Sequence, residues 1–154
     1  MQNLRHFYIS GIFLLCLTAC DTKQTQTDTK TEDTNSATVS TTECYSYVTD
    51  KDTIATQFTL TGNSVTGTLQ YKLSGKDKNT GSLTGQMHGD TLLAEYAFMS
   101  EGVQSVREVI FLKKNNNLIE GFGDIEEKDG KMVFKDKAAL KFDSNTPMKK
   151  MECK

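Results

Sequence analysis

The sequence predicts a mostly β fold, namely a small antiparallel up-and-down β-barrel or a strongly curved meander of about eight strands. Three observations support this prediction. From Cys44 onward, apolar residues alternate with polar ones, as in strands with one buried and one solvated face. Turn residues rich in glycine and asparagine separate these runs at short spacing. No stretch of the predicted domain, residues 44–154, keeps a period of 3.6 residues between helix caps, so no long helix is expected.

The first two strands are the clearest in the sequence. Residues 54–60 and 65–73 each alternate apolar and polar side chains. Residues 61–64 lie between them and supply the glycine and asparagine that a tight hairpin needs at positive φ. These segments therefore predict a β-hairpin.

The same pattern continues along the chain. Further strands are expected over residues 83–87, 92–98, 105–113, 118–125, 132–134 and 138–142. Glycines lie inside several of these strands, among them Gly67, Gly85 and Gly121. Glycine within a strand allows sharp coiling or a close backbone approach, so we interpret these positions as barrel curvature, with a ligand against exposed backbone as the alternative.

Residues 1–19 are typical of a signal peptide. Arg5 gives a basic start, residues 7–16 are almost wholly apolar, and the small residues Thr18 and Ala19 follow. This apolar run is shorter than the ~20 residues that a permanent membrane-spanning helix needs. A cleaved leader is therefore expected.

The residues Leu17, Thr18, Ala19 and Cys20 resemble the lipobox of bacterial lipoproteins, in which the cysteine is acylated and becomes the mature N-terminus. The resemblance implies that acyl chains on Cys20 hold the protein on a membrane. Anchoring becomes stable once more than one acyl chain is present, because each buried methylene contributes ~0.8 kcal/mol. The implied location is the cell envelope, on the extracytoplasmic side of the outer or the cytoplasmic membrane, and the sequence does not choose between the two.

The segment 20–43 is low in complexity and consists mainly of Thr, Asp, Lys, Gln and Ser. Such a segment cannot bury enough apolar surface to offset the ordering of its backbone. We therefore expect a disordered tether between the lipidated Cys20 and a single β-barrel domain over residues 44–154.

Cys44 and Cys153 lie at the two ends of this predicted domain. The first and last strands of a closed barrel are neighbours, and disulfides persist outside the cytoplasm. A structural disulfide across the barrel seam is the expected arrangement, with two free thiols as the alternative. Two cysteines alone lack the other ligands of a structural zinc, so no metal site is expected.

Residues 99–108 are the most unusual stretch of the predicted domain, interpreted as a long hairpin end that carries Glu101, Arg107 and Glu108. Strand alternation directs either Arg107 or Glu108 towards the barrel interior, where a charge needs a partner. Glu120 on the next strand is the partner predicted for Arg107. This group is either an ion pair at the barrel rim or an anchor for a ligand head group.

Composition argues against several functions. The formal net charge is −2 and there is no basic run, so no nucleic-acid partner is expected. His88 is the only histidine after the leader, and we interpret it as a solvated turn residue. With no nucleophile–base pair or metal cluster readable around it, neither a catalytic centre nor a cofactor is expected.

Two roles stay open for the domain. Its outline is lipocalin-like, which implies a module that binds a small apolar ligand or a protein partner. A lipid-anchored small barrel with a terminal disulfide is also similar in outline to bacterial inhibitors of host lysozyme. However, Lys76 follows Ser74 and Gly75 where that family's loop has an aromatic residue. A cavity favours the first role, whereas a protruding loop favours the second.

Overall fold

The computed structural model describes residues 39–142 and 145–154. The predicted leader, Cys20 and the tether up to residue 38 lie outside the described residues. The described part contains ten strands and one short 3₁₀ turn. They are β1 (Ser40–Val48), β2 (Thr53–Thr61), β3 (Ser64–Lys72), β4 (Asn79–His88), β5 (Thr91–Ser100), β6 (Val103–Lys114), β7 (Asn117–Gly121), β8 (Ile125–Lys128), β9 (Lys131–Phe134), η1 (Lys137–Ala139) and β10 (Met148–Met151).

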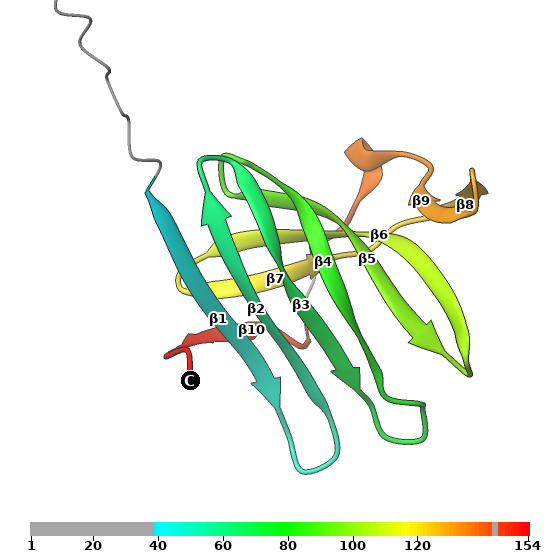
Figure 1. Cartoon of the computed structure of the whole chain (residues 1–154), viewed down its shortest axis with the longest axis horizontal. Coiled ribbons are helices and arrows are strands. Elements are labelled where there is room, and N and C mark those ends of the chain that lie inside the picture. The colour runs from blue at the N-terminus through cyan, green and yellow to red at the C-terminus, as the bar shows by residue number, and fades with distance from the viewer. Residues whose placement is uncertain (1–38, 143–144) are drawn as a thin grey trace, which may run out of the picture. The chain divides into compact units, whose positions relative to one another are not determined.

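Eight of the strands close an antiparallel barrel, which confirms the predicted fold class. Strands β1 to β7 follow one another around the barrel, and β10 fills the place between β7 and β1 (Figure 1). The β8–β9 hairpin lies outside the barrel and joins β6 through one parallel bridge, between Arg107 and Met132. The architecture is therefore an up-and-down barrel with a hairpin inserted before its last strand.

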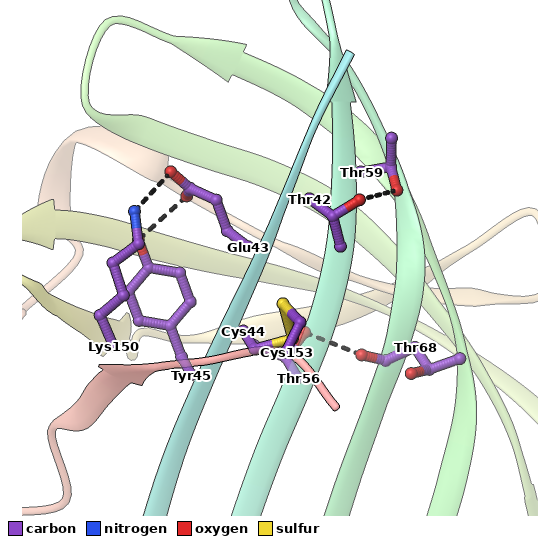
Figure 2. Close-up of a disulfide and its surroundings, with 9 residues drawn as sticks. All are labelled: Thr42, Glu43, Cys44, Tyr45, Thr56, Thr59, Thr68, Lys150 and Cys153. Atoms are coloured by element: carbon purple, nitrogen blue, oxygen red, sulfur yellow. Dashed lines mark hydrogen bonds and ion pairs between the residues drawn. A yellow bond between two sulfur atoms is a disulfide. The ribbon is translucent and has the colours of Figure 1, made fainter.

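The barrel begins earlier in the chain than the sequence predicts. β1 starts at Ser40 and pairs with β2 over its whole length, so residues 40–43 belong to the sheet and not to a tether. Hydroxyl pairs stabilise this part of the sheet: Ser40 Oγ lies 3.2 Å from Thr61 Oγ1, and Thr42 Oγ1 lies 3.1 Å from Thr59 Oγ1 (Figure 2). The prediction failed here because the outward residues are as polar as the preceding segment.

The C-terminal part departs most from the prediction. The strand expected over 118–125 is two strands, since β7 ends at Gly121 and β8 begins at Ile125. The closing strand expected over 138–142 is wrong: this segment forms η1 and a single bridge between Phe122 and Lys141. β10 closes the barrel instead. The sequence of β10, Met-Lys-Lys-Met, lacks the apolar alternation that predicts a strand, because one of its two inward positions is a lysine.

The long hairpin end expected over 99–108 is also wrong. β5 and β6 stay paired to Ser100 and Val103, and a two-residue turn joins them. Glu101 and Gly102 occupy this turn with φ of 51° and 79°. Positive φ at both central positions suits the right-handed twist of a hairpin, which explains why the strands continue so far.

The centre of the barrel is filled by side chains. The largest include Tyr45, Phe58, Leu83 and Phe111, each no more than 2% exposed. A methyl group added at Gly67 would collide with the carbonyl oxygen of Gln57 on β2. Glycine is therefore required where neighbouring backbones approach closely, in agreement with the curvature interpretation of the glycines within strands.

The predicted disulfide is confirmed. Cys44 on β1 is bonded to Cys153, which follows β10, with a Cα–Cα distance of 5.3 Å and a sequence separation of 109 residues (Figure 2). Closing a loop of this length stabilises the folded state by up to ~4.7 kcal/mol on the chain-entropy account. The bond holds the short closing strand against β1.

Candidate functional site

The barrel interior has two polar ends. The β2–β3, β4–β5 and β6–β7 turns surround one end, here called the Glu43 end, and the β1–β2, β3–β4 and β5–β6 connections surround the other, the Arg107 end. Each end contains a buried carboxylate, Glu43 at 7% exposure and Glu120 at 8%. Burial of a carboxylate is costly without partners, so the surroundings of each decide what that end can do.

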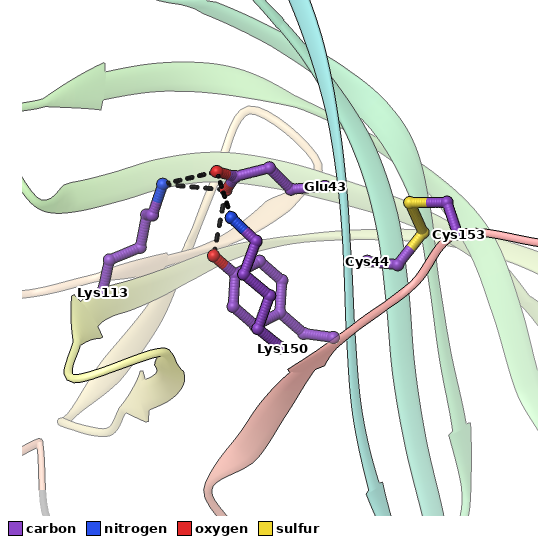
Figure 3. A network of polar contacts seen from close by, with 6 residues as sticks. Glu43, Cys44, Lys113, Lys150 and Cys153 are labelled. Atoms are coloured by element: carbon purple, nitrogen blue, oxygen red, sulfur yellow. Dashed lines mark hydrogen bonds and ion pairs between the residues drawn. A yellow bond between two sulfur atoms is a disulfide. The ribbon is translucent and has the colours of Figure 1, made fainter.

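At the Glu43 end, both oxygens of the buried carboxylate have hydrogen-bond partners. Glu43 accepts hydrogen bonds from Lys113 Nζ at 2.8 and 3.0 Å, from Lys150 Nζ at 3.0 Å and from the Tyr45 hydroxyl at 3.0 Å. Figure 3 shows this network on one side of β1 and the disulfide of Cys44 on the other. Burial alone would raise the pKa of Glu43, but these hydrogen bonds outweigh it and lower the pKa below its ordinary value. The buried charge of Glu43 is therefore compensated by the two lysines.

At the Arg107 end, a guanidinium lies among aromatic rings. Arg107 Cζ is 5.0 Å from the ring centre of Tyr71, 5.6 Å from that of Tyr96 and 5.9 Å from that of Phe98. Such contacts stabilise a cation through the electron-rich ring faces. Arg107 Nη2 lies 4.0 Å from Glu120 Oε1, so the predicted partners do face each other, at a distance longer than a hydrogen bond.

A hydrogen bond across the barrel interior holds the Glu120 carboxylate in place. The Tyr71 hydroxyl donates to Glu120 Oε1 at 2.7 Å, and these residues lie on β3 and β7, opposite one another in the ring of strands. Burial raises the pKa of Glu120, against the lowering effects of the Tyr71 hydrogen bond and the Arg107 charge. Burial and the adjacent Glu120 likewise raise the pKa of Tyr71. Glu120 therefore takes up a proton more readily than a solvated glutamate.

A pocket of about 380 Å³ opens at this end and is here called the mouth pocket. Its apolar and aromatic walls are Ile54, Tyr71, Leu73, Tyr96, Phe98 and Phe122. Its polar groups come from Lys76, Asn79, Arg107, Glu120 and Thr146. A mostly apolar concave surface with a few convergent polar groups is the usual form of a small-molecule site.

Three residues that line the mouth pocket each carry a buried polar atom with no hydrogen-bond partner within the described residues: Asn79 Oδ1, the Tyr96 hydroxyl and Arg107 Nε. Tyr96 is fully buried, and burial raises its pKa to about 12, so its hydroxyl is protonated at neutral pH. An unpaired buried polar group costs about 1–3 kcal/mol, and most such groups in native proteins are paired. The unpaired atoms therefore need a partner from outside the described residues.

The structure separates the other predicted site residues from this pocket. Glu101 is exposed in the β5–β6 turn. Glu108 accepts hydrogen bonds from Lys137 Nζ at 2.8 Å and from the Phe134 backbone N–H at 3.0 Å, so it fastens the end of β9 and the start of η1 to the barrel wall. Neither carboxylate lines the mouth pocket. His88 is exposed at the end of β4.

Sequence reasoning missed Asn79, Tyr71 and Tyr96 as site residues. The two tyrosines lie on inward-facing stripes of their strands, where a tyrosine hydroxyl needs a partner and marks a candidate site. Asn79 carries no motif. Its role follows from the β3–β4 connection, which brings it to the Arg107 end.

No group of three or more His, Cys, Asp or Glu side chains in the described part of the chain is arranged to hold a metal ion. Within the same residues, no helix has the length and apolar character to cross a membrane. Comparison with protein-family models, with curated proteins and with solved structures found no match to this chain.

Proposed function

We propose that this chain is a lipid-anchored binding protein of the bacterial cell envelope, and that its mouth pocket holds a small amphipathic ligand. The observation that carries the binding role is that three residues lining one mostly apolar pocket each carry a buried polar atom without a partner in the described part of the chain. A protein keeps such atoms at a cost to its stability, and a ligand that pairs them repays this cost on binding. The lipobox resemblance at Cys20 supports the anchor.

The filled barrel centre limits the size of the ligand. Side chains such as Tyr45, Leu83 and Phe111 occupy the middle of the barrel, so a ligand in the mouth pocket does not extend into a deep cavity. A volume of about 380 Å³ lies near the lower end of the range for small-molecule sites, about 300–1,000 Å³. The ligand is therefore a compact molecule rather than a long lipid chain.

Native mass spectrometry tests the binding role. The full chain is purified from bacteria and released from detergent micelles in the instrument. We expect a discrete extra mass that disappears on denaturation, and extraction then identifies the ligand. A bare polypeptide with acyl chains, together with failure to bind any small molecule offered, would contradict a ligand-binding role and favour a protein partner.

Replacement of the candidate lipidation site tests the anchor. Cys20→Ser removes the thiol that would carry the acyl chains, so this variant should leave the membrane fraction, whereas the wild type should stay in it. Cys16→Ser is the matched control, because Cys16 lies within the predicted leader and should not alter fractionation. Membrane retention of Cys20→Ser would rule out the anchor.

A further inference from the structure

The Arg107 guanidinium lacks an acceptor that matches its geometry. Guanidinium is a planar fork of five N–H donors, and the aromatic faces around it stabilise its charge without accepting hydrogen bonds in its plane. The carboxylate of Glu120 stays 4.0 Å from Nη2, and the buried Nε has no partner within the described residues. Arg107 therefore keeps a buried donor without an acceptor in the described part of the chain.

The Tyr96 hydroxyl adds a second kind of donor. Tyr96 lies directly opposite Arg107 on the neighbouring strand, and its hydroxyl is buried and unpaired. A carboxylate supplies two coplanar oxygens, which match the guanidinium fork and leave lone pairs for a hydroxyl donor. Phosphate would also pair with Arg107, but its greater charge and solvation fit poorly beside buried Glu120 and the apolar walls.

The walls of the mouth pocket define the rest of the ligand. Ile54, Leu73 and Phe98 line it from separate parts of the barrel, and Phe122 lies at the pocket with 51% of its surface exposed. A compact apolar group placed against these side chains removes their surface, and that of Phe122 in particular, from water.

We propose that the mouth pocket binds a small monocarboxylic acid with a compact apolar body, its carboxylate hydrogen-bonded to Arg107 and Tyr96 and its body against Leu73, Phe98 and Phe122. This inference rests on the proposed binding role and adds the chemical class of the ligand. The nearest charged groups are Arg107, Glu120 and Lys76, so the ligand anion meets two cations and one carboxyl group.

Ligand binding beside Glu120 should be coupled to the uptake of a proton. The groups that face it are Tyr71 from β3, Tyr96 from β5 and Arg107 from β6, and its pKa is already raised by burial. A second carboxylate beside Glu120 disfavours its ionised form further, so binding should take up a proton. Affinity should consequently rise as pH falls from neutrality, as long as the ligand acid stays ionised.

Isothermal titration calorimetry on the full chain in detergent micelles tests the ligand class with three probes that share a benzyl group: phenylacetate, its isosteric amide phenylacetamide, and the cationic phenethylamine. We expect phenylacetate to bind roughly tenfold or more tighter than the amide, because a charge-assisted pair with Arg107 is lost, and the amine to bind weakest. Repeating the titration in buffers of different ionisation enthalpy should reveal proton uptake with phenylacetate alone.

Two variants separate binding from folding. Arg107→Gln should abolish the preference for phenylacetate. Tyr96→Phe should weaken phenylacetate binding roughly threefold to tenfold, yet melt at or above the wild-type temperature, because it removes a hydroxyl that has no partner in the free protein. Tyr45→Phe is the matched control: its hydroxyl bonds Glu43 at the other end of the barrel, so it should lower the melting temperature and leave binding unchanged.

The outcomes distinguish the inference from the proposed function. Tighter binding of the amide or the amine would overturn the carboxylate class while leaving a binding pocket in place. A lower melting temperature and unchanged binding for Tyr96→Phe would show that the hydroxyl serves the fold, and would also overturn the inference. If no probe binds and no ligand copurifies, the inference fails together with the binding role.

Discussion

Two tyrosines near opposite ends of the barrel show how differently the ends are built. The Tyr45 hydroxyl donates to Glu43 within a network that also contains two lysines, whereas the Tyr96 hydroxyl has no partner within the described residues. Both side chains are at most 2% exposed, so burial does not distinguish them. The difference lies in pairing. The paired groups of the Glu43 end stabilise the fold, whereas the unpaired groups of the Arg107 end are those expected of a binding site.

Replacement of Glu43 tests whether its hydrogen-bond network stabilises the fold. Glu43→Gln should lower the free energy of unfolding by about 1–2 kcal/mol, because the ion pairs with Lys113 and Lys150 are lost, with the loss limited by the partial exposure of the lysines. Urea unfolding at pH 7 measures the effect. Glu126→Gln, at an exposed position in β8, is the control and should change stability by less than about 0.5 kcal/mol. Equal effects of the two variants on stability would contradict a stabilising role of the Glu43 network.

The pH dependence of stability follows from the same residue. The folded-state pKa of Glu43 is lowered from 4.5, so its contribution to stability is present above about pH 4.5 and is lost as pH falls through the folded-state pKa. Glu120 has the opposite sign: its folded-state pKa is raised, so its contribution is present below about pH 4.5 and is lost as pH rises.

Unfolding of the wild type and of Glu43→Gln across acid pH separates the two residues. We expect the stability gap between the two proteins to be largest near neutrality and to narrow as pH falls below about 4.5, since glutamine does not titrate. A gap that stays constant or widens in acid would mean that Glu43 is not the ionised acceptor.

At the scale of the elements, alternation made most of the barrel predictable. The strands β2 to β5 were found because apolar positions recur at every second residue along each of them and glycine or asparagine lies between them. The same rule left the orientation of Arg107 open, since Val109, Ile110 and Phe111 are consecutive and apolar, and all three are buried. Only the cross-strand register, with Arg107 opposite the inward-facing Tyr96, resolves that ambiguity.

β10 and the mouth pocket could not be predicted for a different reason. β10 owes its place to pairing with β1 and β7 and to a lysine that reaches Glu43, and both are contacts between residues far apart in the chain. The unpaired atoms of Asn79, Tyr96 and Arg107 come from three separate strands. Local pattern carries no information about such convergence until the register of the whole sheet is known.

The close approach of β2 and β3 at Gly67 can be tested directly. Gly67→Ala places a methyl group against the β2 backbone, so it should destabilise the barrel by about 1–3 kcal/mol. Thr66→Ala on the outward face of the same strand is the control and should have a much smaller effect. Denaturant unfolding compares the two, and a neutral Gly67→Ala would show that the strands separate without strain.

For the molecule as a whole, the disulfide links the two ends of the described barrel. The double variant Cys44→Ser, Cys153→Ser should lose about 2–5 kcal/mol of stability. Hydrogen exchange of β10 should increase more than that of β3 and β4, because β10 has only four residues and depends on the bond for its attachment. Uniform acceleration across all strands would argue that the bond stabilises the barrel globally.

The position of β10 also has a consequence for biosynthesis. Ribosomes make the chain from its N-terminus, so all the other barrel strands exist before β10 does. In that interval β1 and β7 are both open edges, the feature of a sheet through which separate nascent chains associate. Completion of the ring waits for the four residues of β10 and formation of the disulfide waits for Cys153 just after them, so the unfinished barrel is the species most exposed to aggregation.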